Sequence, residues 1–448
     1  MEIAELAEKL LQDYALCDRC LGRQFALLVS GTDNLERGKA LKLVLTAKAH
    51  MMILERDAQG ERLLEKLATN GFFKPAYETL KKQGIVLEEK QKECYLCRGK
   101  TEEIEPLTEE IAQELRKLHF NTFLVGIKMP PSVVDEEDEI KSKLGIIWGE
   151  EIRNEFSREM GKAISRKTGK EVDHKNPEVS ISVDPFQGEF QVRVNPVYLI
   201  GRYRKLVSRI PQTAWTCKIC NGQGCPECKG LGGTSGNSVE EIISRPILEI
   251  MSCEEIRFKP IGREDKDSKV LGEGRPFIIE VRGAKQVPFT LTPLQELMNK
   301  SGSKKIEVTR LARATREIAR KITTRIQTTV LYRVTLELKV EISAEKLEAL
   351  ERAFSKVVVS QYVPSSKSRP RQRQQKYIYE TFIRRLAPDQ IELMIKCQGG
   401  IRIRDLFSEA EFKTEPSLTD ILGAEPSKIQ VDVMDVQLEG LDEETQGI

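Results

Sequence analysis

Residues 262–283 read GREDKDSKVLGEGRPFIIEVRG, a charged half followed by an apolar half. Acidic and basic side chains crowd between the glycines of the first half, among them Arg263, Glu264, Asp265 and Asp267. The pattern predicts a loop that leads into a strand. Rigid sheets often position functional loops of this kind, although charged, glycine-rich loops also occur as inert connections. The surrounding sequence has to decide between these two interpretations.

The region around this loop, from residue 238 to the C-terminus, alternates strands with a few helices. We predict helices at 238–251, 308–326 and 343–355, and strands at 276–283, 330–342, 391–397 and 428–438. Such an order favours a mixed or antiparallel sheet covered by helices on one side. The predicted fold class is therefore α+β.

The chain before residue 238 divides into three further parts. Residues 1–106 show apolar residues at helical spacing, and residues 107–201 mix helices with the strands NTFLVGIKM, EVSISVDP and EFQVRVNPVYLI. Residues 130–139, PPSVVDEEDE, are expected to form an acidic loop because proline interrupts regular structure. Residues 202–237 form a cysteine-rich linker, which leaves 238–448 as the last domain.

Eight of the ten cysteines form four CxxC pairs. One predicted quartet is compact, namely Cys217, Cys220, Cys225 and Cys228, and the other joins two distant pairs, namely Cys17, Cys20, Cys94 and Cys97. Each CxxC offers zinc two of its four tetrahedral ligands, and an all-cysteine site leaves no open position for water. A redox role lacks the βαβ pattern around the motif. We therefore expect structural zinc.

Length and composition exclude several classes of protein. The 448 residues suggest about three domains, and no apolar run reaches the ~18 residues that a membrane helix needs. The N-terminus lacks the features of a secretory signal, so a cytoplasmic protein without membrane contact is expected. There is no GxxxxGK[ST] loop, and the three histidines, His50, His119 and His174, all precede the last domain.

Charge is distributed unevenly despite a net charge of only +2. Residues 300–386 contain 21 Lys and Arg against 8 Asp and Glu, whereas residues 387–448 contain 5 against 14. Arg310, Arg313, Arg316 and Arg320 would line one face of the predicted helix, and phosphates would relieve their repulsion. Arg371 and Arg373 precede Tyr377 and Tyr379 in the predicted loop SSKSRPRQRQQKYIY. Nucleic acid is the favoured partner, with a solvated basic surface as the alternative.

Five segments then resemble a known family in sequence and in order: RCLGRQFA, GRYRKLVSRIPQTAW, GREDKDSKVLGEGRPF, CQGGIRIRDLF and KTEPSLTDILG. Together they resemble the archaeal and eukaryotic tRNA pseudouridine synthases of the "Pus ten" family, and the glycine-rich cysteine cluster resembles the archaeal members. The resemblance implies a zinc-binding accessory region with a THUMP module, which corresponds to 107–201, followed by a pseudouridine synthase catalytic domain. It also implies a monomer without an organic cofactor that isomerises uridine at tRNA position 54, 55 or both.

The resemblance assigns roles to individual residues. Asp265 matches the catalytic aspartate, Tyr332 matches the tyrosine that stacks on the target base, and Ile403 with Arg404 matches a late apolar and basic pair. The basic member pairs with the aspartate, and many members have lysine at the position of Arg404. The predicted substrate contacts are Arg263, Ile403, Arg313, Arg316, Arg371 and Arg373.

The chemistry needs only an ionised carboxylate, which attacks either the sugar or the base, and a neighbouring arginine favours the charged form. The stacked target base must first be flipped out. Ser268 and Lys269 replace the usual Val-Arg, and Lys259-Pro260-Ile261 replace smaller residues, which motivates an alternative: a catalytically impaired, zinc-stabilised tRNA-binding protein. Another THUMP-bearing modifier, such as a thiolase or methyltransferase, would need an ATP loop or a methyl-donor site, and the sequence contains neither.

Overall fold

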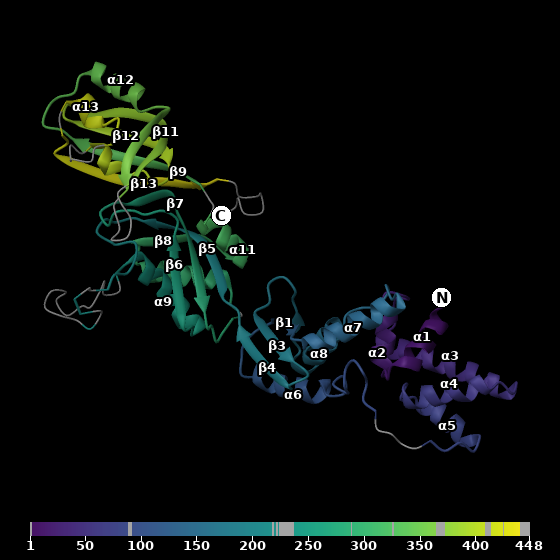
Figure 1. The fold of residues 1–448 in the computed structure, drawn as a ribbon. Coiled ribbons are helices and arrows are strands. Elements are labelled where there is room, and N and C mark those ends of the chain that lie inside the picture. The colour runs from purple at the N-terminus through teal and green to yellow at the C-terminus, as the bar shows by residue number, and fades with distance from the viewer. Residues whose placement is uncertain are drawn as a thin grey trace. The chain divides into compact units, whose positions relative to one another are not determined.

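The structure is a computed structural model that describes residues 2–87, 92–216, 219–220, 223, 237–287, 289–324, 327–363, 372–407, 414–423 and 425–439. The chain forms two compact units, Met1–Asn195 and Pro196–Ile448. Helices and strands are mixed in both, as the α+β prediction requires (Figure 1). Within the described part of the chain, every helix is too short or too polar to cross a membrane.

The first unit begins with short helices, coloured purple in Figure 1. They are α1 (Ile3–Asp13), α2 (Asp18–Gly22), the 3-10 helix η1 (Arg23–Phe25), α3 (Asn34–Leu54), α4 (Ala58–Thr69) and α5 (Lys74–Lys82). Leucines at helical spacing fill their core, including Leu6, Leu10, Leu64 and Leu67. The prediction of a helical N-terminal region is confirmed.

The rest of this unit is a four-stranded sheet with the order β2-β1-β3-β4. Its elements are α6 (Ile104–Leu115), β1 (Thr122–Ile127), α7 (Pro131–Leu144), α8 (Ile152–Thr168), β2 (Glu171–Val172), β3 (Val179–Asp184) and β4 (Glu189–Val194). Strands β1, β2 and β3 are parallel, and β4 is antiparallel to β3. Helices α6 and α8 pack against each other and contact β4 and β1, respectively (Figure 1).

The predicted loop at 130–139 is wrong, because α7 runs through it. Pro131 occupies the first turn of the helix, where no amide hydrogen bond is lost, so its ring starts the helix and does not break it.

The second unit is built on a nine-stranded mixed sheet with the order β10-β11-β12-β9-β13-β7-β5-β8, to which β6 adds by pairing with β7. The strands are β5 (Val197–Lys205), β6 (Glu255–Pro260), β7 (Val270–Arg282), β8 (Ile306–Ala314), β9 (Thr328–Glu337), β10 (Val357–Val363), β11 (Gln372–Ala387), β12 (Gln390–Gln398) and β13 (Lys428–Leu438). Among the described strands of this sheet, the β13–β7 pair is parallel and the other pairs are antiparallel. The predicted mixed sheet is confirmed.

Helices flank this sheet at both ends (Figure 1). They are α9 (Val239–Met251), α10 (Leu291–Gly302), α11 (Arg316–Thr324), α12 (Ala344–Ala353), α13 (Leu418–Leu422) and the 3-10 helix η2 (Ile403–Phe407). Helices α9, α10 and α11 contact β6, β8 and β5, whereas α12 contacts β11 and α13.

The helix predicted at 308–326 is wrong in its first half. Residues Ile306–Ala314 form strand β8, which pairs with β5, and helix α11 starts only at Arg316. Arg310 has a positive φ of 53° at an irregularity in the pairing, and this bulge breaks the two-residue alternation that would have indicated a strand. The four arginines therefore do not share one helical face.

Two other segments also pair differently from the prediction. EFQVRVNPVYLI forms two strands, and the second, β5, joins the large sheet, so the expected boundary at residue 201 falls inside β5. The predicted basic loop becomes strand β11 from Gln372 onward.

Two glycines in the opening quoted stretch allow β7 to fit between its neighbours. Gly272 and Gly274 have φ of +52° and +80°. A Cβ at Gly272 would lie 2.0 Å from the Met434 carbonyl oxygen of β13, and one at Gly274 would lie 2.7 Å from the Tyr203 carbonyl oxygen of β5. Glycine is thus required at both positions, because the backbones of β13 and β5 approach β7 too closely there for a side chain.

Candidate active site

Asp265 lies on the loop that joins β6 to β7, residues 261–269, here called the Asp265 loop. Its side chain is 60% exposed, so a ligand can reach the carboxylate. Arg404, 139 residues away in sequence, donates from Nε to Asp265 Oδ2 at 2.8 Å. The structure thus brings together the aspartate and the basic residue that the resemblance paired.

Helix η2 carries Arg404 to this position. The Nη1 of Arg404 also donates to the carbonyl oxygen of Ile429 on β13, at 3.2 Å. The preceding residue, Ile403, is buried, which fixes η2 against the core while Arg404 points outward.

A buried ion pair lies beneath the exposed Asp265. Glu264 and Arg275 are 0% and 1% exposed, and the Arg275 Nε donates to Glu264 Oε2 at 2.7 Å. The two other nitrogens of Arg275 donate to the carbonyl oxygens of Ile261 at 2.8 Å and of Arg263 at 3.3 Å. Arg275 therefore ties the start of the Asp265 loop to strand β7.

Tyr332 lies on the buried face of β9, together with Val330, Val334 and Leu336. It is paired with Val433 of β13, whose amide donates to the carbonyl oxygen of Lys269 at the end of the Asp265 loop. Burial raises the pKa of Tyr332 to about 12, and the nearby Arg275 guanidinium acts in the opposite direction. The ring is only 8% exposed, so it does not offer an open stacking surface, and its role as a stacking residue stays a prediction.

A second carboxylate, Asp405, lies close to Asp265. Burial raises its pKa, Arg402 opposes this shift, and the charge of Asp265 adds to it. Arg402 pairs with Asp405 at 3.0 Å. The segment IRIRD therefore supplies both arginines of two arginine–aspartate pairs, Arg402 with Asp405 and Arg404 with Asp265.

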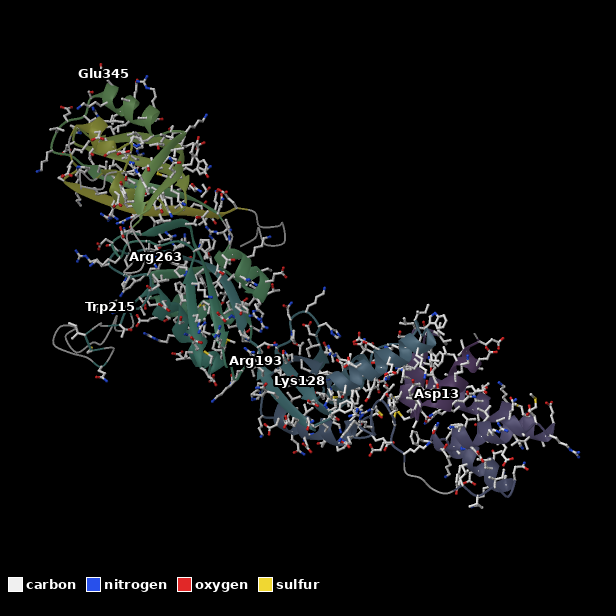
Figure 2. The ribbon with its side chains drawn as sticks, in the orientation of Figure 1. Asp13, Lys128, Arg193, Trp215, Arg263 and Glu345 are labelled. Atoms are coloured by element: carbon white, nitrogen blue, oxygen red, sulfur yellow. The ribbon has the colours of Figure 1, made fainter. Side chains whose placement is uncertain are left out.

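The predicted tRNA contacts are spread over several elements. Arg263 is exposed on the Asp265 loop (Figure 2). Arg313 is exposed on β8, where its guanidinium stacks over Phe289 at 4.3 Å, and Arg316 is exposed at the start of α11. The last two remain close in sequence, on either side of the strand-to-helix turn.

Arg373 lies on β11 and pairs with Glu415, with its guanidinium 5.5 Å from the Tyr362 ring centre. Tyr377 and Tyr379 on the same strand meet edge to face at 5.1 Å. Arg371 lies outside the described residues.

In the first unit, the four distant cysteines converge. The sulfur atoms of Cys17, Cys20, Cys94 and Cys97 all lie within 4.8 Å of one another, and all but Cys17 are buried. The Cys17 and Cys97 sulfurs are 3.7 Å apart. Tetrahedral zinc with Zn–S bonds of about 2.3 Å requires sulfurs about 3.8 Å apart, so the four residues are able to bind a metal such as zinc. Of the second predicted quartet, Cys217, Cys225 and Cys228 lie outside the described residues.

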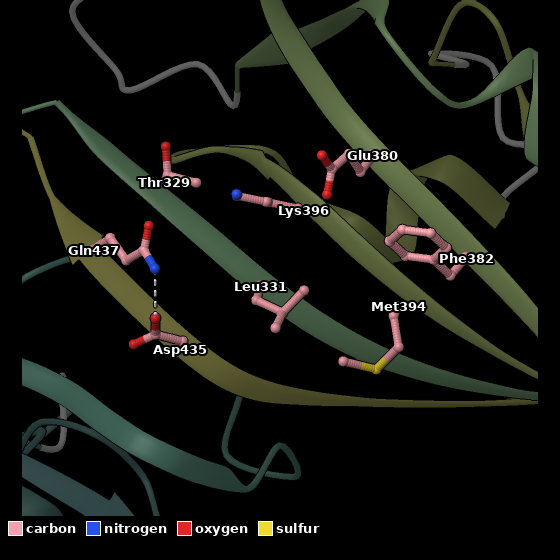
Figure 3. A pocket seen from close by; sticks show the side chains of 8 residues that line it. All are labelled: Thr329, Leu331, Glu380, Phe382, Met394, Lys396, Asp435 and Gln437. Carbon is pink, nitrogen blue, oxygen red and sulfur yellow. Dashed lines mark hydrogen bonds between the residues drawn. The ribbon is translucent and has the colours of Figure 1, made fainter.

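Besides an apolar hollow of about 490 Å³ along α1 and α3, two hollows with more polar linings lie away from this site. One, of about 360 Å³, lies on the sheet formed by β11, β12, β9 and β13 (Figure 3). Its lining includes Leu331, whose side chain points to the opposite face from Tyr332, because neighbours on a strand alternate. The other, of about 800 Å³, lies between α8 and the edge of β1 in the first unit and is lined by polar and basic residues, including Ser157, Arg158, Lys162, Arg166 and His174.

The roles of Arg275 and of the groove along α8 are not predicted from the sequence. Arg275 stands just before the apolar run PFIIEV, and a basic residue beside a buried strand was the only signal of an internal ion pair. The groove residues recur at spacings of three and four along 154–166, which places them on one helical face.

Two parts of the chain match family models. Residues 198–437 match "Pus10, C-terminal", and residues 107–184 match "Pus10 THUMP domain, archaeal". A THUMP domain followed by a Pus10 C-terminal domain defines the class of THUMP-bearing pseudouridine synthases.

Curated relatives match along nearly their whole length. The tRNA pseudouridine synthase Pus10 of Thermofilum pendens is 34% identical, with 96% of this chain and 94% of the relative covered. Those of Methanothrix thermoacetophila and Methanocaldococcus jannaschii are 30% and 32% identical, covering 97% and 96% of this chain and 94% and 93% of the relatives. The chain belongs to the Pus10 family of tRNA pseudouridine synthases, which are isomerases.

The buried ion pair generates a stability prediction. Arg275→Met should lower the free energy of unfolding by about 3 kcal/mol or more, because it removes the nearest partner of a buried carboxylate. Chemical denaturation of the full chain measures the loss. The control is Arg257→Met, whose partner Glu255 and own side chain are about half exposed, and it should cost less than about 1 kcal/mol. Equal losses in the two variants would contradict the importance of the buried pair.

Proposed function

We propose that this protein isomerises uridine to pseudouridine in the T-arm of tRNA, at position 54, 55 or both, with Asp265 as the nucleophile. The observation that carries the proposal is the exposed Asp265 carboxylate, 2.8 Å from Arg404, in a member of this family. The Arg404 Nε–H donates a charge-assisted hydrogen bond at that distance, which holds the carboxylate in a fixed direction.

The reaction is an isomerisation and needs no oxidant, reductant or added group. The bond between C1′ of the ribose and N1 of uracil breaks while the carboxylate attacks the sugar or the base. The uracil turns, C1′ bonds to C5, the proton of C5 is lost, and N1 gains a proton. Asp265 leaves unchanged, so one carboxylate serves every cycle.

The target base must leave its stack to reach Asp265, which costs a few kcal/mol. Tyr332 is proposed to contact the flipped base, with Ile403 packing nearby. With a pKa of about 12, the Tyr332 phenol stays neutral at physiological pH and keeps its proton as a hydrogen-bond donor.

The wider tRNA surface is proposed to contact Arg263, Arg313, Arg316, Arg371 and Arg373, through phosphates that basic side chains neutralise. The groove along α8 is proposed to hold the acceptor end of the tRNA, as the THUMP module does in related enzymes. Arg158, Lys162 and Arg166 line this groove, and each also pairs with a glutamate, so the proposal requires phosphates to compete with these ion pairs.

Zinc at the first cysteine quartet is proposed to be structural. The four thiolates complete a tetrahedron and leave no position for substrate or water. The metal would join Cys17 and Cys20, at the start of α2, to Cys94 and Cys97, in the turns that precede α6. The second quartet is proposed to bind a further zinc ion.

The central test is Asp265→Asn, which keeps the size of the side chain and removes its charge. We expect pseudouridine formation on an unmodified tRNA transcript to fall at least about 1,000-fold, while the dissociation constant for tRNA changes less than threefold. Pseudouridine mapping and filter binding measure the two quantities.

The matched control is Asp389→Asn, an exposed aspartate in the turn between β11 and β12, which should keep full activity. If the wild-type chain forms no pseudouridine but binds tRNA, the protein is the catalytically impaired binding protein instead. Full activity in Asp265→Asn would reject the nucleophile.

A second prediction concerns the basic turn between β8 and α11. Arg313→Glu with Arg316→Glu should weaken tRNA binding and lower the slope of log affinity against log salt by about one per lost phosphate contact. Binding is measured from low to moderate salt. The control pair, Arg352→Glu with Arg384→Glu, makes the same charge change on α12 and β11. An unchanged slope in the first pair would remove this turn from the interface.

The third prediction concerns the metal. Cys94→Ser with Cys97→Ser should remove one zinc equivalent in elemental analysis and unfold the N-terminal helices, because structural zinc contributes about 10–16 kcal/mol in peptide sites. Cys253→Ser, at a cysteine outside both quartets, should keep the zinc content and the melting curve. Absence of metal in the wild-type chain, with melting unaffected by a strong chelator, would refute the zinc site.

A further inference from the structure

Lys205, the last residue of β5, has no exposed side-chain surface. Its ammonium group donates to the carbonyl oxygens of Ile210 at 2.9 Å, Asp265 at 3.1 Å and Lys266 at 3.4 Å. It also lies 3.4 Å from Glu264 Oε1. A buried lysine has three protons to donate, and here the backbone of the Asp265 loop receives most of them.

Lys205 is part of a set of side chains that binds the loop backbone almost continuously. Arg275 holds the carbonyl oxygens of Ile261 and Arg263, and Gln212 holds that of Gly262 at 3.2 Å. Together with the two bonds from Lys205, five of the six carbonyl oxygens from 261 to 266 accept a hydrogen bond from a side chain. Most loops of this length leave such groups to solvent.

The charges beneath the loop are arranged around one carboxylate. Glu264 lies between the guanidinium of Arg275 and the ammonium of Lys205, and it also accepts a hydrogen bond from the Tyr203 hydroxyl at 2.9 Å. Gln212 donates in turn to that hydroxyl, at 2.9 Å. Burial lowers the pKa of Lys205, and Glu264 acts in the opposite direction.

Asp265 is therefore held through both its backbone and its side chain. Its backbone carbonyl accepts from the Lys205 ammonium and from the Ser268 amide, each at 3.1 Å, and its carboxylate accepts from Arg404. Arg275 and Gln212 bind only residues before Asp265, so Lys205 is the side chain that fixes the peptide of Asp265 itself.

We propose that Lys205 is a positioning residue for pseudouridine formation: it fixes the direction of the Asp265 carboxylate without touching the substrate. This inference rests on the proposed role of Asp265 as the nucleophile. A shift of about 1 Å in a reacting group can cost about 100-fold in rate, so the loss of the Lys205 contacts should slow the chemical step and leave tRNA affinity largely intact.

The test uses Lys205→Met in the full chain. The fold should persist, because Glu264 keeps its closer partner, Arg275, at 2.7 Å. We expect the single-turnover rate at saturating enzyme to fall about 100-fold, while the dissociation constant for an unmodified tRNA transcript changes less than threefold. Assays are run well below the melting midpoint of each variant. If Lys205→Met does not fold, Lys205→Gln, which keeps two donors without charge, takes its place and should lose about 10-fold.

Two further variants separate positioning from plain loss of stability. Glu264→Gln removes the charge balance of the cluster and should lower the melting midpoint, yet it keeps Lys205 on the Asp265 carbonyl and should retain the rate to within about 10-fold. Lys346→Met removes a lysine that donates to the Leu422 carbonyl oxygen at 3.1 Å between α12 and α13, and it should keep the full rate.

The outcomes are distinct. A rate within threefold of wild type in Lys205→Met, or a parallel loss of rate and affinity, overturns the inference. So does an equal loss of rate in Glu264→Gln, since stability alone would then explain both. If Asp265→Asn stays active, the proposed nucleophile fails first. If Asp265→Asn is inactive and Lys205→Met is fully active, only the positioning role fails.

Discussion

The buried carboxylate of Glu264 is the constraint around which the site of the second unit is built. Desolvating a carboxylate costs several kcal/mol unless cations and hydrogen bonds surround it. Arg275 on β7 and Lys205 on β5 meet this need because the two strands are neighbours in the sheet. The same two cations have further donors, and these bind the backbone on both sides of Glu264. The next side chain along the loop, Asp265, then points away from this cluster into solvent, exposed but attached to a fixed backbone.

The strand order of the sheet connects the Asp265 loop with Tyr332 and Arg404. Asp265 precedes β7, Tyr332 lies on β9, and β13 runs between the two strands, parallel to one and antiparallel to the other. Strand β13 therefore contacts both parts of the site: the Val433 amide donates to the carbonyl oxygen of Lys269 at the end of the Asp265 loop, and the Ile429 carbonyl oxygen accepts from Arg404. The glycines Gly272 and Gly274 permit the close approach of β7 to this strand and to β5. Strand β13, near the C-terminal end of the described chain, is thereby paired directly with β7, which begins just after the Asp265 loop.

The sequence predicted those parts of the structure that local pattern controls. Alternating apolar residues marked β9, β12 and β13, and helical spacing of apolar residues marked α9 and α12. The convergence of Cys17 and Cys20 with Cys94 and Cys97 was predicted because zinc needs four ligands and each CxxC pair supplies two. Strand β8 was missed because the bulge at Arg310 breaks its alternation and basic residues with high helix propensity follow it. The buried cluster around Glu264 was missed for a different reason: charged residues are expected on the surface, and only the pairing of β5 with β7 shows that three of them can share one interior site.

The arginine at position 404 shows how the resemblance and the geometry complement each other. Many family members have lysine there, yet the guanidinium of Arg404 makes two contacts that diverge by the width of its planar fork, one from Nε to Asp265 and one from Nη1 to Ile429. A single ammonium centre could satisfy both acceptors only if they lay close together. In this chain the Arg404 side chain therefore has two roles. It is the counter-ion of Asp265, and its contact with β13 fixes the position of that cation. Under the proposed mechanism, charge shifts on the Asp265 carboxylate during the reaction, and a fixed cation then needs less reorganisation, which is the condition under which electrostatic stabilisation is most effective.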